Sequence, residues 1–339
     1  MQLLTILSTA FNAVLPIVFM IGLGYFLRSS NFISEEFVKI GNKLVFHVCL
    51  PCMLFVNVYE INQLSDIRWD VVIYICLMIF VLFFIGVVAA VLTTREEKRR
   101  GVIAQSVFRS NMAIIGLSLA AAVGGDDAVA VASIVSAFSV SFYNVLAVIS
   151  LTMFLPHDHK NHFAGVLRNI TRNPLIIGIS LGMVCLLLRE VQIQLFGMPV
   201  FLLSRDLKVV YTVLRNLNTI TSPLALLILG GQFVFSAVRQ LWKEVAVGTL
   251  CRIVVSPLVG IGCAVLLTSL GVLNFGPSEF PALIAVFGSP TAVSSAIMAR
   301  QMGNDEQLAT QFVVWTSIGS VFTIFLTVCI LMAIGMLQV

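Results

Sequence analysis

Ten stretches of this 339-residue chain stay apolar for about 20 residues, the length that an α-helix needs to cross the hydrocarbon core of a bilayer. Hydrophobic residues make up 59% of the chain and charged residues 11%, against about 45–50% and about 25% in soluble domains. A water-soluble fold cannot bury so many apolar side chains, which excludes soluble enzymes, secreted disulfide scaffolds, disordered regulators and nucleic-acid binders. The chain is therefore predicted to be an all-α polytopic membrane protein. The ten predicted spans are 9–27, 37–59, 70–92, 102–123, 128–154, 171–188, 207–235, 243–270, 280–299 and 308–337.

The seven cysteines all lie within apolar runs, including Cys49 and Cys52, whose spacing resembles a redox motif. Cysteines in such runs are usually small buried residues, so we expect neither disulfides nor metal ligands, and no cofactor. The first apolar stretch lacks a basic leading region and a convincing cleavage site, which indicates a first membrane span rather than a removable signal.

Lysine and arginine are distributed unevenly among the loops, and cytoplasmic loops usually carry the excess. With the N-terminus outside, thirteen of the 20 basic residues fall on the inner side and five on the outer side, while Arg109 and Arg252 remain inside spans. The run from Arg95 to Arg100 is the strongest inner anchor. We therefore expect a multi-pass protein of the cell membrane with both termini extracytoplasmic.

Weak internal similarity relates the two halves of the chain. Spans 1 and 6 each hold a proline followed eight residues later by a glycine, and spans 2 and 7 each hold a proline after a polar first half. The matched positions are Pro16 and Gly24 with Pro174 and Gly182, and Pro51 with Pro223. Five spans per repeat is an odd number, so the second copy must be inverted relative to the first. Inverted repeats with interrupted helices are typical of secondary transporters, whose binding site lies near the midplane.

Two spans carry signals for a break in the helix. Gly288-Ser289-Pro290 interrupts span 9, because proline lacks an N–H and clashes with the preceding turn. We expect Pro290 in the first turn of a second half-helix that Ser289 caps. Span 4 has its expected weak point at Gly116-Leu-Ser118, without a proline. In inverted repeats both second halves would start near the membrane centre, where helix N-termini attract anions; a simple packing kink is the alternative.

Five segments resemble the auxin efflux carrier family in its short bacterial form. They read FRSNMAIIGLSLAAAVGG, SVSFYNVLAVISL, RNPLIIGISLG, SPLALLILGGQF and FGSPTAVSSAIMARQMG. The resemblance covers essentially the whole chain in the family's motif order. That form includes malonate and malate carriers and is similar to the plant PIN-type auxin exporters. The family usually has GLPL at the first crossover where this chain has GLSL, so Ser118 leaves open whether span 4 breaks as span 9 does.

The resemblance implies a carrier of organic anions with ten spans in two inverted five-span repeats, similar in fold to bile-acid/sodium symporters. Residues 1–156 would form the first repeat, 157–170 a cytoplasmic linker and 171–339 the second repeat. Spans 1, 2, 6 and 7 would form a scaffold, and spans 3–5 and 8–10 a transport domain with an elevator-like movement. The anion would bind where the broken spans 4 and 9 cross.

Polar and charged residues inside the spans are the candidates for the anion site. Asn111 matches a family asparagine implied in carboxylate binding, and an amide donates hydrogen bonds without the desolvation cost of a full charge. A hydrogen bond between helices is the alternative for Asn111, as it is for Asn144. The full set of substrate-binding candidates is Asn111, Asn144, Gly116, Ser118, Ser289, Pro290, Thr291, Arg252 and Arg109.

The two arginines inside spans have two interpretations each. Arg252 lies about 15 Å along span 8 at 1.5 Å per residue, and it either attracts the anion or bonds to carbonyls freed at a broken helix. Arg109 either serves the site or extends to the inner surface.

The coupling mechanism stays open in the sequence. His47 in span 2 is a candidate for proton coupling, with a hydrogen-bonded structural histidine as the alternative. The histidines at 157, 159 and 162 suggest a metal site superficially, but a solvated linker accounts for them. No Asp or Glu lies deep in a span, so proton coupling has no obvious carboxylate here. The alternatives are a potential-driven uniporter, exchange, and sodium coupling through backbone oxygens.

The leading function is therefore secondary transport of small organic anions such as malonate, malate or auxin-like acids. Its rivals are a sodium-coupled symporter of larger amphipathic acids and a membrane sensor that binds its ligand without moving it. An enzyme is not expected, because the spans hold no nucleophile–base pair, metal set or phosphate loop. The organic anion and the lipid bilayer are the expected partners, a homodimer stays open, and no nucleic acid is expected.

Overall fold

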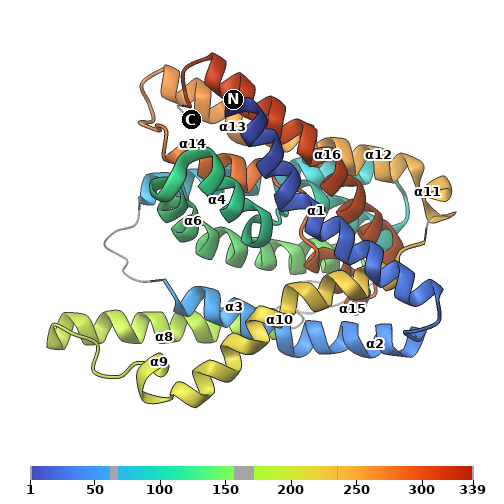
Figure 1. The fold of residues 1–339 in the computed structure, drawn as a ribbon, viewed down its shortest axis with the longest axis horizontal. Helices are drawn as coiled ribbons and strands as arrows, with labels where there is room; N and C mark the ends of the chain where they lie inside the picture. The colour runs from blue at the N-terminus through green and yellow to red at the C-terminus, as the bar shows by residue number, and fades with distance from the viewer. Residues whose placement is uncertain (1, 62–67, 156–171, 235, 338–339) are drawn as a thin grey trace, which may run out of the picture.

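The computed structural model describes residues 2–61, 68–155, 172–234 and 236–337, and all regular elements in these ranges are helices (Figure 1). Within these described ranges, seven helical segments have the length and apolarity of membrane spans, and each overlaps one of the ten predicted spans. They are Glu35–Tyr59, Trp69–Thr93, Asp127–Met153, Pro174–Phe196, Lys208–Gln232, Trp242–Ser269 and Glu306–Ala333. The predicted linker 157–170, with its histidines, lies outside the described residues.

The two halves of the chain contain the following elements, in which η marks a π-helical turn. The first half holds α1 (Gln2–Ser29), α2 (Glu35–Leu44), η1 (Val45–Cys49), α3 (Leu50–Tyr59), α4 (Trp69–Thr93), α5 (Glu97–Phe108), η2 (Met112–Gly116) and α6 (Leu117–Met153). The second half holds α8 (Pro174–Phe196), α9 (Leu203–Asp206), α10 (Lys208–Gln232), α11 (Ser236–Gln240), α12 (Trp242–Leu250), η3 (Cys251–Val255), α13 (Ser256–Ser269), α14 (Glu279–Leu283), η4 (Ile284–Gly288), α15 (Ser294–Gln301) and α16 (Glu306–Ala333).

Proline explains two of the π-helical turns. Pro51 near the start of α3 follows η1, and Pro257 near the start of α13 follows η3. Because proline has no N–H and its ring crowds the preceding turn, the helix widens ahead of it instead of stopping. Accordingly, the N–H of Leu50 donates to the carbonyl of Val45, five residues back. The span therefore continues through its proline without a break.

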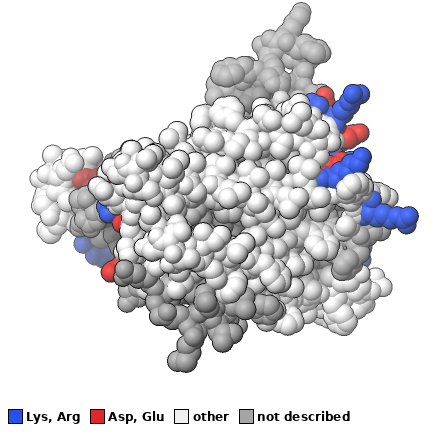
Figure 2. Space-filling model, turned by 90° about the horizontal axis from the view of Figure 1, so that it is seen from above, with Lys and Arg blue, Asp and Glu red and all other residues white. Residues whose placement is uncertain are grey.

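The helices form two groups. Figure 1 shows α2, α3, α8 and α10 in one layer, with α4, α6, α12, α13 and α16 above it. Within the first group α3 packs against α8 and α10, and α1 crosses the molecule while packing against α10 and α16. In the second group α4 packs against α5 and α6. Figure 2 shows charged side chains gathered at two opposite ends of one face, with a broad uncharged belt between them, as a membrane protein requires.

Small residues bring the helices of the first group into close contact. A Cβ atom at Gly24 of α1 would overlap the backbone of Leu227 in α10, and one at Gly230 of α10 would overlap the backbone of Ile21. Such backbone-to-backbone packing is typical of membrane helices, because lipid offers no hydrophobic gain and contact area must come from close approach. The pair α1 and α10 is therefore fixed by glycine on both sides.

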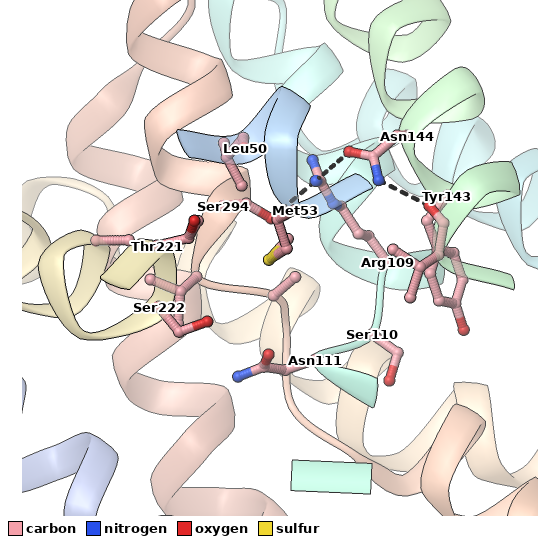
Figure 3. A pocket seen from close by; sticks show the side chains of 14 residues that line it. Leu50, Met53, Arg109, Ser110, Asn111, Tyr143, Asn144, Thr221, Ser222 and Ser294 are labelled. Carbon is pink, nitrogen blue, oxygen red and sulfur yellow. Dashed lines mark hydrogen bonds between the residues drawn. The ribbon is translucent and has the colours of Figure 1, made fainter. Parts of the chain in front are cut away.

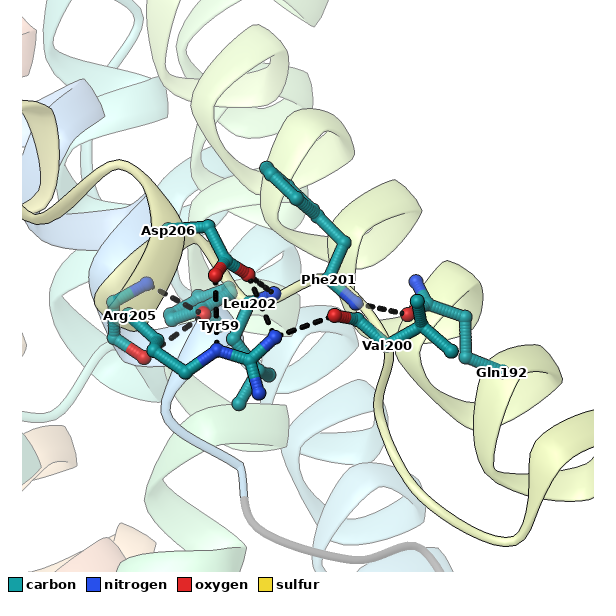
Figure 4. Close-up of polar contacts among 8 residues, drawn as sticks. Tyr59, Gln192, Val200, Phe201, Leu202, Arg205 and Asp206 are labelled. Atoms are coloured by element: carbon teal, nitrogen blue, oxygen red, sulfur yellow. Dashed lines mark hydrogen bonds and ion pairs between the residues drawn. The ribbon is translucent and has the colours of Figure 1, made fainter.

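The connection between α8 and α10 is held by polar contacts (Figure 4). The Phe201 N–H donates to Gln192 Oε1 at 2.6 Å, and the hydroxyl of Tyr59 in α3 accepts from the Ser204 N–H at 3.2 Å. Asp206 pairs with Arg205 at 2.9 Å, and hydrogen bonds from Arg205 and from the Leu202 N–H hold the pKa of the Asp206 carboxyl below its usual range. This end of the first group is thus tied to α3 rather than left as a free loop.

We expect Gly24→Val to lower the stability of the folded protein by about 1–3 kcal/mol or more, because the new side chain must displace the backbone of α10. Gly22→Val is the matched control, since a Cβ at Gly22 meets nothing within 4 Å. The measurement is the thermal unfolding midpoint of both variants in the same detergent. Equal midpoints for the two variants would contradict the contact.

Candidate functional site

Two interrupted helices cross, and their non-helical segments pair with each other. The first break lies between α5, which ends at Phe108, and η2, which begins at Met112. The second lies between η4, which ends at Gly288, and α15, which begins at Ser294. The Asn111 N–H donates to the Pro290 carbonyl at 2.8 Å, and Ser110 and Thr291 form an antiparallel bridge. Each break therefore supplies backbone partners for the other.

The first break lies seven residues before the predicted weak point. Gly116 is the last residue of η2 and Ser118 is in the first turn of α6, so both are inside a helix, and the side chain of Ser118 lies outside the described part of the structure. Gly116 instead allows close packing, because a Cβ there would lie 3.1 Å from Ala285 of η4. The predicted position of the break was therefore wrong. The helix ends at Arg109–Asn111, where its backbone pairs with the second crossover, and not at the small residues Gly116 and Ser118.

The second break lies at the predicted place but differs in detail. Pro290 is in the extended crossover, and α15 begins four residues later at Ser294. Ser289 is therefore not the N-cap of the half-helix; its side chain is fully buried and its hydroxyl has no hydrogen-bond partner among the described residues. The backbone pairing with the first crossover keeps Pro290 and Thr291 extended and delays the start of the helix.

Arg252 in η3 is completely buried and donates to backbone carbonyls of both interrupted helices. Nε and Nη2 donate to the Ser289 carbonyl at 2.9 and 2.7 Å, Nη2 also to Val286 at 2.9 Å, and Nη1 to Val107 at 3.1 Å. These carbonyls stand at the C-terminal ends of the first half-helices, where no intrahelical donor remains. These contacts match the second interpretation given above, in which Arg252 bonds to backbone carbonyls that are freed where a helix breaks.

A cavity of about 50 Å³ lies between the crossing and two other helices (Figure 3). The crossovers and α6 form one wall, and α3 and α10 form the wall opposite. The lining residues are Leu50, Met53, Arg109, Ser110, Asn111, Val140, Tyr143, Asn144, Thr221, Ser222, Ala225, Ala292, Val293 and Ser294.

Arg109 is 2% exposed and lines this cavity, so it does not extend to a surface. Its Nη2 donates to Asn144 Oδ1 and to Ser294 Oγ, each at 2.8 Å. Neither acceptor carries a charge, and no Asp or Glu lines the cavity within the described ranges. Asn144 Nδ2 also donates to the Val140 carbonyl at 2.7 Å, which leaves this amide one further N–H. Asn144 therefore orients Arg109.

Asn111 is 5% exposed, and its Nδ2 has no hydrogen-bond partner in the described structure. Figure 3 shows its amide group directed toward the open centre, across from Ser222. A buried amide without a partner costs about 1–3 kcal/mol, unless something else accepts its hydrogen bond. The cavity thus holds a positive charge and an unused donor.

Six candidates that the structure describes lie outside the cavity lining. The Thr291 hydroxyl donates to the Ser106 carbonyl, and Thr291 is not among the residues that line the cavity in the described structure. His47 is exposed in η1, with Nδ1 at 3.0 Å from the Lys43 carbonyl. The binding role of Thr291 and the proton-coupling role of His47 stay predictions, as do the binding roles of the remaining four. These four are Gly116, Ser289, Pro290 and Arg252, while the side chain of Ser118 lies outside the described part of the structure.

Sequence reasoning missed the wall formed by α3 and α10. Thr221 and Ser222 of α10 and Met53 of α3 reach the cavity, as does Ser294 at the start of α15. A signal for them was present, because Thr221 and Ser222 directly precede Pro223 in a span that was already noted for a polar first half.

The long apolar helices define a multi-pass membrane protein. Two interrupted helices that cross beside a cavity with polar side chains are typical of transporters. Comparison with known proteins agrees: this chain belongs to the membrane transport protein family, whose model matches residues 9–328. This match confirms the predicted membership in the auxin efflux carrier family, and the protein is therefore a membrane transporter.

Two archaeal proteins are similar to the chain over nearly their full lengths. An uncharacterized transporter of Methanothermobacter thermautotrophicus is 22% identical over 320 residues, covering 92% of this chain and 95% of the relative. An uncharacterized transporter of Methanocaldococcus jannaschii is 23% identical over 327 residues, covering 93% and 96%. Their names indicate transport, and no substrate.

We expect Arg252→Gln to lower stability by about 3 kcal/mol or more, because buried carbonyls of two helices lose a charged donor. Arg215→Gln removes the same charge from an exposed position of α10 and is the control. Thermal unfolding in detergent measures both. If Arg252→Gln unfolds like the control but loses affinity for anions, the first interpretation, attraction of the substrate, holds instead.

Proposed function

We propose that this transporter is a secondary carrier of small organic anions, which bind in the cavity beside the crossing of the two interrupted helices. The observation that carries the proposal is the combination of a charged guanidinium without an acidic partner and an unpaired buried amide donor at one wall. A carboxylate would supply the missing negative charge and accept from Asn111, which are the two things that the cavity lacks.

The proposed architecture is ten spans in two inverted repeats. Pairing of equivalent glycines supports it: Gly24 of span 1 packs on span 7, and Gly182 of span 6 packs on Phe55 and Val58 of span 2. Both glycines follow a proline by eight residues, and the two helix pairs exchange places as inverted copies would. Two interrupted helices that pair through their breaks add to this support.

We assign spans 1, 2, 6 and 7 to a scaffold and spans 3–5 and 8–10 to a transport domain that moves as in an elevator. The cavity lies between α3 and α10 of the proposed scaffold and the crossing of the proposed transport domain. A site at such a boundary can change its exposure when one part slides past the other. We also propose the cell membrane as its location, with both termini outside; Figure 1 places the start of α1 and the end of α16 on the same side of the molecule.

The proposal is tested by flux into proteoliposomes that hold the purified protein. Radiolabelled malonate, malate, lactate and indole-3-acetate are offered separately, with and without a sodium gradient, a proton gradient and an imposed potential. Saturable uptake of any one acid supports the carrier, and dependence on sodium would favour the sodium-coupled symporter. Binding of an acid to folded protein without any flux would favour a sensor and overturn the proposal.

We expect Asn111→Ala to raise the KM for the transported acid about tenfold or more, since a hydrogen bond to a charged group is worth about 1.5–3 kcal/mol. Asn42→Ala is the matched control, because Asn42 is also a buried asparagine but lies in α2, away from the cavity. Initial flux rates over a range of acid concentrations measure the effect. A KM unchanged in Asn111→Ala and equal to that of the control would remove Asn111 from the site.

A further inference from the structure

The cavity beside the crossing has two walls of different chemistry. The wall of the crossovers and α6 holds Arg109, the free amide of Asn111 and the hydroxyl of Ser294. Since Ser294 Oγ accepts from Arg109, its own hydrogen is left to donate into the cavity. This wall therefore offers one positive charge and at least two neutral donors. Asn144 keeps a second N–H, and the Tyr143 hydroxyl also lacks a partner among the described residues.

The opposite wall, from α3 and α10, has nothing comparable. Leu50, Met53 and Ala225 are apolar, and the hydroxyl of Thr221 already donates to the carbonyls of Cys49 and Leu217 at 3.2 and 2.6 Å. Thr221 can then only accept a hydrogen bond. The hydroxyl of Ser222 is the one donor that this wall contributes within the described residues.

The second buried arginine does not add to the charge that the cavity offers. Arg252 faces the C-terminal ends of two half-helices, α5 and η4, through the carbonyls of Val107, Val286 and Ser289. Each helix C-terminus carries about half a negative charge, so two of them offset about one positive charge locally. None of the acceptors of Arg109 is a carbonyl at a helix end; they are the neutral side chains of Gln105, Asn144, Ser294 and Met298.

We infer that the site takes a short monocarboxylate, whose single carboxylate lies against Arg109, Asn111 and Ser294 while an apolar or hydroxyl-bearing tail faces α3 and α10. This inference rests on the proposed function and narrows it to one charge class. A dicarboxylate would place its second negative charge beside Leu50, Met53 and the acceptor oxygen of Thr221, with the neutral hydroxyl of Ser222 as its one donor and no positive charge. An unpaired charge in such surroundings is strongly disfavoured. The carriers that the sequence resembles include malonate and malate carriers, and for this chain we place these acids second.

The test compares acids of nearly equal size that differ by one charge. Butyrate is paired with succinate, and lactate with malate, each as an unlabelled competitor against labelled lactate in proteoliposomes. A second set of vesicles carries labelled succinate and labelled malate directly. We expect the monocarboxylate of each pair to compete at a concentration at least tenfold lower, and the dicarboxylates to show little saturable flux.

Variants at Arg109 separate charge from shape. Arg109→Gln should weaken competition by butyrate about tenfold or more and should abolish the preference for butyrate over the neutral analogue butyramide. Arg109→Lys keeps the charge and should retain that preference even where its affinity falls. Arg215→Gln, on an exposed face of α10, removes one charge outside the cavity and should leave the selectivity unchanged. Where Arg109→Gln yields no folded protein, the wild-type pairs and Arg109→Lys decide the question.

The outcomes distinguish the inference from the proposed function. Saturable flux of malonate, malate or succinate that exceeds the flux of lactate and butyrate would overturn the monocarboxylate inference and leave the organic-anion carrier standing. No saturable flux of any of these acids, from protein that unfolds cooperatively on heating, would overturn both.

Discussion

An interrupted helix inside an apolar layer must find partners for the peptide groups that its break exposes, and most features of this structure follow from that requirement. Lipid supplies no donors or acceptors, so each unsatisfied group would cost several kcal/mol. In this structure two broken helices cross, so that the Asn111 N–H donates a hydrogen bond to the Pro290 carbonyl. The remaining carbonyls at the helix ends accept from Arg252. The breaks are therefore stable only as a pair.

The same arrangement separates two arginines by role. Arg252 donates its hydrogen bonds to backbone carbonyls, and the partial negative charges of the helix C-termini offset its positive charge. Arg109 is held by Asn144 and Ser294 beside a cavity, and its charge remains available to a ligand. Burial alone does not tell the two apart, since both are nearly inaccessible. The hydrogen-bond acceptors distinguish the two arginines. Backbone carbonyls at a helix end offset the charge of Arg252, whereas neutral side chains beside a cavity do not offset the charge of Arg109.

The sequence predicted the membrane class and the positions of the long spans well, because length and apolarity decide both. It also named Arg109, Asn111 and Asn144 among nine binding candidates, because polar residues inside spans are few, and the structure brings these three to one cavity. It could not locate the first break, because Gly116 and Ser118 look weaker than Arg109–Asn111 in a single helix. That break is decided by the partner segment, which is about 180 residues away in the chain and invisible to local patterns.

The wall formed by α3 and α10 was missed for a related reason. Thr221 and Ser222 look like ordinary polar residues near a proline, and only the packing of α10 across from the crossing gives them a position at the cavity. Side-chain type predicts which residues are unusual for their surroundings. It does not predict which neutral residues complete a cavity whose other wall lies in a distant helix.

The pairing of Ser110 with Thr291 also has a consequence for synthesis in the cell. Helices enter the membrane in order from the N-terminus, so α5 and its break arrive long before η3 and the second crossover exist. Until Arg252 and Pro290 have been inserted, the carbonyl of Val107 and the N–H of Asn111 lack their final partners. A truncation before residue 290 would therefore leave these backbone groups of a membrane helix without the partners that they have in the full-length protein.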